Sequence, residues 1–169
     1  ETLKSLLTRQ GRLPIEDVRR ILLEAAEGLQ AAHDAGVVHR DIKPENLMLE
    51  GKTGRILIMD FGIAKAMDAS VDHALTGTGV VIGTPQYMSP EQAMGKSAPE
   101  PRSDQYSLAA VGYQMLTGRV PFEGDNVREV MARQLLEEPT PLSRIVNGIP
   151  SSLSATIHSP SPRRTVESR

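Results

Sequence analysis

HRDIKPEN, residues 39–46, is the most informative stretch of this 169-residue chain. It places an aspartate, a lysine and an asparagine within six residues, and Asp60-Phe61-Gly62 begins 14 residues after Asn46. Two short apolar runs lie between these motifs, separated by the turn Gly51-Lys52-Thr53-Gly54. This pattern predicts a β-hairpin over residues 46–59 that returns Asp60 to the side of Asn46. Two oxygen ligands can therefore face one metal site.

Two further motifs follow, Gly83-Thr84-Pro85 and Ser89-Pro90-Glu91. Together with HRDIKPEN and the DFG triplet, they resemble the catalytic, magnesium and substrate-side loops of protein kinases. The resemblance is specifically to eukaryotic-type Ser/Thr kinases of the bacterial branch. A single HRD or DFG triplet arises by chance, but the order of all these motifs and the hairpin between them argue against chance.

The resemblance implies an α+β, protein-kinase-like fold, in which a mainly helical C-terminal lobe carries a small β-hairpin. It covers residues 1–148, which would form that lobe. The sequence contains no G-x-G-x-x-G loop and no V-A-I-K lysine, which belong to the N-terminal lobe of such kinases. The N-terminal lobe is therefore expected to be absent from this chain, and the chain alone is expected to be inactive.

Phosphoryl transfer from ATP requires a positioned nucleophile and neutralised phosphate charge. By resemblance, Asp41 orients the acceptor hydroxyl and Lys43 follows the γ-phosphate. Asn46 and Asp60 match the two ligands of Mg²⁺ or Mn²⁺, hard cations that prefer oxygen. Lys43 at its position is typical of Ser/Thr rather than Tyr specificity.

The same resemblance assigns four more residues around ATP and the acceptor. Thr84 would hydrogen-bond the catalytic aspartate and lysine. Glu45 would offer its backbone carbonyl to the ribose. Met48 and Met59 would flank the adenine and phosphate side of the site.

Residues 66–82 include Ser70 and the run Thr76-Gly77-Thr78-Gly79, which predicts a loop where such kinases have their activation loop. Thr76 and Thr78 stand where bacterial kinases of this type are commonly autophosphorylated. Arg40 could receive such a phosphate with its planar donor fork. The alternative is that both threonines are simply solvated.

Five residues are expected to support the site rather than react. His39 would be a packed structural histidine, while Phe61 and Gly62 complete the magnesium loop. Glu91 matches the glutamate of the APE motif, with Ser89 in place of alanine. Asp104 would hold the catalytic loop through its backbone amides.

Apolar spacing predicts helices that would build the core. Residues 15–35 keep a helical period of apolar positions, and residues 104–117 contain an apolar run. Shorter helices are expected over residues 2–9 and 126–137.

The composition excludes several classes of protein. A net charge of −2 implies no nucleic-acid partner and no polybasic membrane surface. The absence of cysteine excludes disulfides and thiolate metal sites. No apolar run approaches the roughly 18–20 residues needed to span a bilayer. We expect a cytoplasmic location and a protein substrate with a Ser or Thr acceptor, although many relatives carry a membrane helix outside the kinase domain.

Residues 149–169 are predicted to be a truncated or frameshifted, disordered tail, because from about His158 the chain becomes Ser-, Pro- and Arg-rich. Either a natural tail or a truncated or frameshifted reading frame would explain this change. Two other functions stay open beside the kinase, namely a non-catalytic pseudokinase-like binding module and an inert gene fragment. The presence of Asp41, Lys43, Asn46 and Asp60 argues against a degenerate site.

Overall fold

The computed structural model describes residues 1–61, 84–94 and 100–158. The helices of more than one turn, in chain order, are α1 (Leu3–Gln10), α2 (Ile15–Asp34), α4 (Pro90–Ala93), α5 (Pro101–Thr117), α6 (Val127–Leu136) and α7 (Ser151–His158). The short 3-10 helices and strands are η1 (Pro44–Asn46), β1 (Leu47–Leu49), β2 (Ile56–Ile58), η2 (Pro85–Tyr87) and η3 (Leu142–Arg144). The mainly helical fold with one small hairpin is confirmed.

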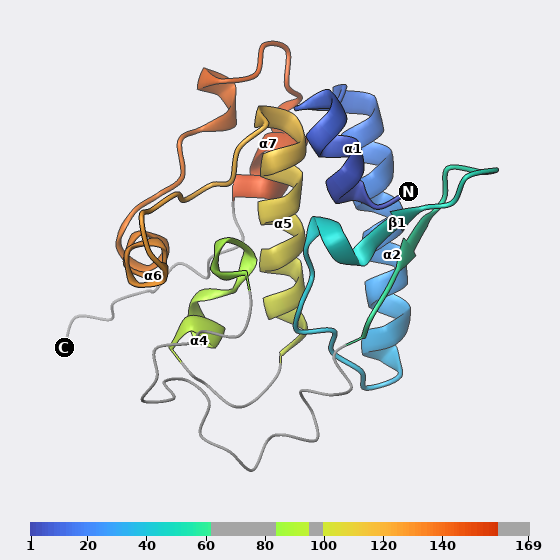
Figure 1. The fold of residues 1–169 in the computed structure, drawn as a ribbon, viewed down its shortest axis with the longest axis horizontal. Coiled ribbons are helices and arrows are strands. Elements are labelled where there is room, and N and C mark those ends of the chain that lie inside the picture. The colour runs from blue at the N-terminus through green and yellow to red at the C-terminus, as the bar shows by residue number, and fades with distance from the viewer. Residues whose placement is uncertain (62–83, 95–99, 159–169) are drawn as a thin grey trace.

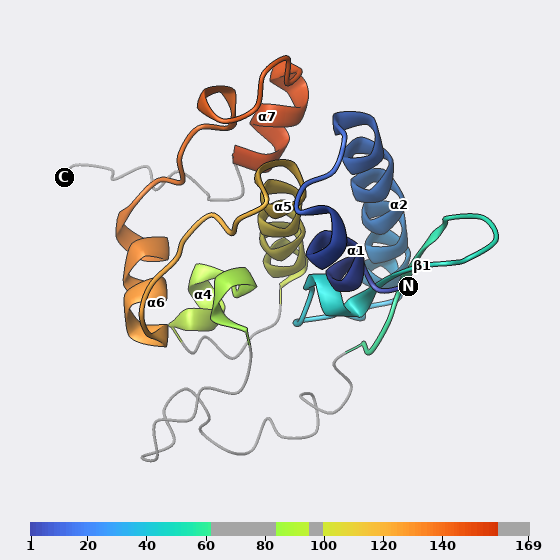
Figure 2. The same cartoon turned by 45° about the horizontal axis from the view of Figure 1, so that its top comes forward.

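Helix α5 is the centre of the domain (Figure 1). Twelve of its 17 residues are buried, so it is surrounded by other elements instead of presenting one apolar stripe. Helices α1 and α2 lie to one side of it, and α4 and α6 lie to the other (Figures 1 and 2). The predicted helix over residues 104–117 is confirmed, with its start three residues earlier at Pro101.

Helix α2 packs against α5 through the apolar face that its period predicted. Val18, Ile21, Ala25 and Leu29 are its buried residues. The two helices approach closely at Gly112 of α5, where an added Cβ would lie 3.0 Å from a methyl group of Leu22. The predicted long helix over residues 15–35 is confirmed to within one residue.

The predicted hairpin is also present. Strands β1 and β2 are antiparallel, with Met48 opposite Leu57. On the other edge of β1, Thr2 bridges to Met48 and the backbone nitrogen of Leu49 donates to Glu1. The N-terminal residues therefore continue this small sheet by one isolated bridge.

The C-terminal segment differs from the expectation. Residues 151–158 form α7 instead of a disordered tail, because Leu153 and Ile157 are apolar, lie one helical turn apart and are buried. An added Cβ at Gly112 would lie 3.3 Å from a methyl group of Ile157, which shows how closely α7 packs on α5. The predicted disorder from residue 149 is thus wrong for α7, whereas residues 159–169 lie outside the described part of the chain.

No helix among the described residues is long and apolar enough to cross a membrane.

Candidate active site

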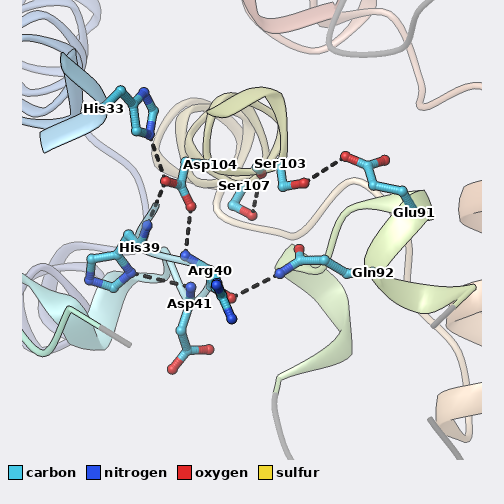
Figure 3. A network of polar contacts seen from close by, with 9 residues as sticks. All are labelled: His33, His39, Arg40, Asp41, Glu91, Gln92, Ser103, Asp104 and Ser107. Atoms are coloured by element: carbon cyan, nitrogen blue, oxygen red, sulfur yellow. Dashed lines mark hydrogen bonds and ion pairs between the residues drawn. The ribbon is translucent and has the colours of Figure 1, made fainter. Parts of the chain in front are cut away.

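Asp104, in the first turn of α5, holds the backbone of the HRD segment (Figure 3). Its carboxylate accepts hydrogen bonds from the backbone N–H groups of His39 and Arg40, each at 2.8 Å. Its third partner is Nε2 of His33 on α2, also at 2.8 Å. Asp104 is fully buried, and a buried carboxylate is tolerated only when donors satisfy it. The predicted role of Asp104 at the catalytic-loop amides agrees with these contacts.

These contacts fix an unusual backbone. Arg40 has φ +69°, in the left-handed region that non-glycine residues rarely adopt. Such a conformation persists where the surroundings hold it in place. Asp104 holds it from the α5 side, and Gln92 of α4 donates from Nε2 to the Arg40 carbonyl at 3.0 Å. The contacts from α4 and α5 to Arg40 thereby help to fix the position of Asp41, the next residue.

His39 joins the catalytic loop to the DFG segment. The Asp41 N–H donates to Nδ1 of His39 at 3.2 Å, so the ring proton belongs on Nε2. That Nε2–H donates to the Met59 carbonyl at 2.8 Å. The His39 ring also lies 4.8 Å from the ring of Phe61, between centroids. His39 is fully buried, which agrees with the packed structural histidine that was expected.

Asp41, Lys43 and Asn46 form one cluster of polar side chains. Lys43 Nζ lies 2.9 Å from Oδ2 of Asp41 in an ion pair. Asn46 Nδ2 donates to the Asp41 carbonyl at 2.8 Å and lies 3.4 Å from the same Oδ2. The Asp41 side chain keeps 26% of its surface exposed, so an acceptor group from outside can reach it.

The hairpin returns Asp60 to the end of the strands where Asn46 lies. The Met59 N–H donates to the Asn46 carbonyl at 2.8 Å, which brings the two predicted cation ligands to the same end of the strands. Asp60 is exposed and has φ +54°, a second left-handed non-glycine residue at the site. Left-handed non-glycine residues are concentrated at functional sites.

The donor set fits a hard divalent cation. Asn46 uses its Nδ2 group for the Asp41 carbonyl, which leaves Oδ1 for a metal, and Asp60 offers a carboxylate. Magnesium favours one or two protein oxygens together with substrate phosphates over an all-protein cage. Within the described residues, no group of three or more His, Cys, Asp or Glu side chains could hold a metal. A cation here would therefore depend on Asp60, Asn46 and a phosphate-bearing ligand.

One face of the hairpin is apolar and partly open. Met48 and Leu57 are directly opposite and so share a face, and Met59 follows Leu57 by two residues on that face. Leu57 and Met59 keep 43% and 38% of their surface exposed, and Met48 is half-buried. This placement is compatible with the expected contact of Met48 and Met59 with adenine, which stays a prediction.

Glu91, in α4, is hydrogen-bonded to the neighbouring helix α5. Its Oε1 accepts a hydrogen bond from the Ser103 hydroxyl of α5 at 2.7 Å (Figure 3). The residue is half-buried, so it is not a fully buried, unsatisfied charge. Burial raises the pKa of the Tyr106 hydroxyl to about 12, and the nearby Glu91 charge adds to that shift.

The remaining predicted site residues are only partly placed. Thr84 directly precedes η2, and its expected bond to the catalytic residues stays a prediction. Glu45 is exposed and lies 3.6 Å from Lys4 in an ion pair. Gly62, Thr76 and Thr78 lie outside the described residues.

Two supporting residues were missed from the sequence, His33 and Gln92. Gln92 had a local signal, because Ser89-x-x-Gln92 is a capping-box pattern, and the structure shows both of its reciprocal hydrogen bonds. His33 had none, since its partner Asp104 is 71 residues away in the chain.

Comparisons with known proteins agree with this geometry. The family model described as "Protein kinase domain" matches residues 1–162. The chain is 45% identical over 144 residues to the probable serine/threonine-protein kinase PknB of Corynebacterium glutamicum, which covers 85% of this chain and 22% of that protein. It is 47% identical over 142 residues to the serine/threonine-protein kinase PknA of Mycobacterium tuberculosis, covering 84% of this chain and 32% of that protein. Its identity to the serine/threonine-protein kinase PknB of Mycobacterium leprae is 41% over 156 residues, covering 92% of this chain and 24% of that protein. The chain therefore spans less than a third of the length of these relatives.

Proposed function

This chain belongs to the protein kinase family, and we propose that it supplies the catalytic-loop half of an ATP-dependent protein serine/threonine kinase. The observation that carries the proposal is the cluster of Asp41, Lys43 and Asn46 on a backbone that Asp104 holds from within the core. The names of the relatives support the same reaction class.

In the proposed reaction, a Ser or Thr hydroxyl of the substrate protein attacks the γ-phosphorus of ATP. Its O–H hydrogen-bonds to Asp41, which orients the oxygen and takes the proton as the new P–O bond forms and the bond to ADP breaks. Lys43, which lies 2.9 Å from Asp41, would neutralise charge on the transferred phosphoryl group. Bound Mg²⁺ or Mn²⁺ supplies further neutralisation of phosphate charge. Asn46 and Asp60 are the residues that would hold it.

Two substitutions in the full-length protein test this assignment. Asp41→Asn should abolish most turnover while nucleotide affinity survives, because Asp41 acts on the hydroxyl. Asp60→Asn should instead weaken magnesium-nucleotide binding, because it removes a charged metal ligand. Asp17→Asn is a matched control on the exposed start of α2 and should change neither property. Equal loss of nucleotide affinity in the two site variants would contradict the roles.

Regulation by phosphorylation is part of the proposal. Arg40 is half-buried beside the catalytic aspartate, and its guanidinium is the expected receiver of a phosphate on Thr76 or Thr78. Replacing both threonines by alanine in the full-length protein should lower activity. Unchanged activity, with no phosphate on this loop by mass spectrometry, would reject the switch.

The proposed location follows from ATP, the phosphate donor. ATP is supplied in the cytoplasm, so the domain is expected there with a protein substrate that presents a Ser or Thr acceptor. A non-catalytic binding module is the alternative, and retained metal-dependent phosphate transfer would exclude it.

A further inference from the structure

Strand β2 has one edge that β1 does not use. Glu50 donates to the Arg55 carbonyl and Met59 donates to the Asn46 carbonyl, and both bonds belong to hydrogen-bonded pairs of the antiparallel ladder. Ile56 lies opposite Leu49, in the alternate, non-hydrogen-bonded pairs, so its N–H points away from β1. An edge N–H of this kind needs a partner from outside the ladder.

Glu24 of α2 is that partner. Its Oε2 accepts the Ile56 N–H at 2.8 Å, although 32 residues separate the two. Arg20, one helical turn earlier, donates from Nη1 to the Gly54 carbonyl at 2.8 Å and to Oε1 of Glu24 at 3.1 Å. Gly54 has φ +68°, in the left-handed region that favours glycine, so Arg20 binds the turn at its left-handed residue.

Gly28 makes a third contact, one turn further along α2. An added Cβ at Gly28 would lie 3.1 Å from Cδ1 of Ile58, which shows how closely β2 passes the helix. Along the helix, Arg20, Glu24 and Gly28 follow at intervals of four residues. Along the strand, Gly54, Ile56 and Ile58 follow at intervals of two.

The two intervals match in length. Four residues of an α-helix rise about 6.0 Å, and two residues of a strand rise about 6.6 Å. One face of α2 can therefore contact every second residue of β2 over three successive contacts. A slip of β2 by one residue would break all three and would turn each of its side chains to the opposite face.

We propose that Arg20, Glu24 and Gly28 form a register lock on β2, and that this lock positions Asp60. Asp60 follows Ile58 by two residues, so the register of β2 decides where its carboxylate lies relative to Asn46. Arg20 and Glu24 are thus positioning residues for the cation site, and this part of the inference rests on the proposed function.

Amide hydrogen exchange tests the lock without reference to catalysis. In the full-length protein, Glu24→Ala should raise the exchange rate of the Ile56 N–H by roughly tenfold or more, because a hydrogen bond to a charged group is lost. Glu24→Gln should keep the protection, since its amide oxygen can still accept. Glu27→Ala is the matched control, because Glu27 is exposed on the same helix. Unchanged exchange in Glu24→Ala would overturn the lock.

Magnesium titration tests the positioning role. Glu24→Ala should raise the magnesium concentration for half-maximal phosphate transfer by about tenfold, because loss of the β2 register would leave the Asp60 carboxylate poorly oriented towards the cation. Glu24→Gln should have a magnesium requirement close to that of the wild type, and Glu27→Ala should not change the requirement. An equal magnesium requirement in Glu24→Ala and Glu27→Ala would overturn the positioning role.

Two further variants separate failure of the lock from failure of the proposed function. Should Glu24→Ala fail to fold, Arg20→Met removes the polar contacts to Gly54 and Glu24 and keeps the aliphatic stem. Arg20→Met should then raise both the exchange rate and the magnesium requirement, and no change in either would overturn the lock. Asp60→Asn reports on the proposed function alone, because an unaltered magnesium requirement there would overturn the cation role of Asp60. The exchange of Ile56 would still decide whether the lock exists.

Discussion

Asp104 and His33 together support the catalytic loop from the core. Asp104 has three donors from two parts of the chain, the His33 ring on α2 and the backbone of His39 and Arg40. In a buried site, each lost donor leaves the carboxylate less compensated, because water cannot replace it. His33 therefore supports the catalytic loop indirectly, through Asp104.

Replacing His33 should measure this support. We expect His33→Phe to lower the free energy of unfolding by about 1–3 kcal/mol, the usual cost of an unsatisfied buried group. His33→Gln should recover part of the loss, because its amide can still donate to Asp104. Urea unfolding of the wild type and both variants gives the comparison. Equal stability of His33→Phe and the wild type would show that Asp104 does not need the ring.

Glu24 should make stability depend on pH. The hydrogen bond from the Ile56 N–H, assisted by Arg20 and Arg55, lowers the pKa of Glu24 below its ordinary value of 4.5, against a smaller opposing effect of burial. Because the folded-state pKa is the lower one, the carboxylate stabilises the fold fully above the unfolded value. This contribution is lost as pH falls through the folded value.

The comparison is acid unfolding of the wild type and Glu24→Gln. We expect the variant to lose less stability than the wild type between about pH 5 and pH 3, since its amide does not titrate. Parallel curves for the two proteins over that range would contradict the lowered pKa.

Helices α2 and α7 both pack closely on α5 at Gly112. A Cβ at Gly112 would lie 3.0 Å from Leu22 and 3.3 Å from Ile157. Gly112→Val should therefore lower the free energy of unfolding by about 1–3 kcal/mol, the typical cost of overpacking a core. Gly112→Ala should cost less, because alanine favours the helix by about 1 kcal/mol over glycine.

The matched control is Ala132→Val on the exposed face of α6, which adds a branched residue to a helix without a core contact. Thermal or urea unfolding of the three variants separates packing from helix propensity. Equal losses in Gly112→Val and Ala132→Val would show that the junction has room for the side chain.

At the level of the domain, α7 closes one end of the core. Its Leu153 and Ile157 are 9% and 3% exposed and belong to the main apolar cluster. We expect the double variant Leu153→Ala and Ile157→Ala to lose about 4 kcal/mol or more, because single large-to-small core changes cost about 2–5 kcal/mol. Ser152→Ala and Ala155→Ser, on the exposed side of the same helix, serve as controls. A double variant as stable as these controls would mean that α7 does not stabilise the domain.

The polypeptide 1–169 by itself should be inert as an enzyme. Its sequence has no glycine-rich phosphate loop and no lysine of the V-A-I-K type, which such kinases need for ATP positioning. Its hairpin also leaves Leu57 and Met59 partly exposed. We expect no measurable phosphate transfer to a basic protein substrate with magnesium-ATP, and a melting temperature below about 55 °C. Robust transfer, with a cooperative melt above that temperature, would contradict this expectation.

Local patterns in the sequence were enough for the family, the hairpin and the main helices. Apolar spacing located α2 within one residue of its observed end, and the turn before Arg55 located β1 and β2. These features depend on neighbours in the chain, so a short window contains their cause. Motif order likewise picked out Asp41, Lys43 and Asn46, which the structure brings into one cluster.

Contacts between distant segments were decided only by the tertiary structure. Nothing near His33 indicates that it meets Asp104, and nothing near Glu24 indicates that it completes the edge of β2. The helix at residues 151–158 was missed because its short apolar repeat gains stability by packing on α5, and an isolated helix of that length is marginal in water. These features all depend on which polar groups and apolar side chains become buried. Burial is decided by the packing of the helices, which a short window of sequence does not contain.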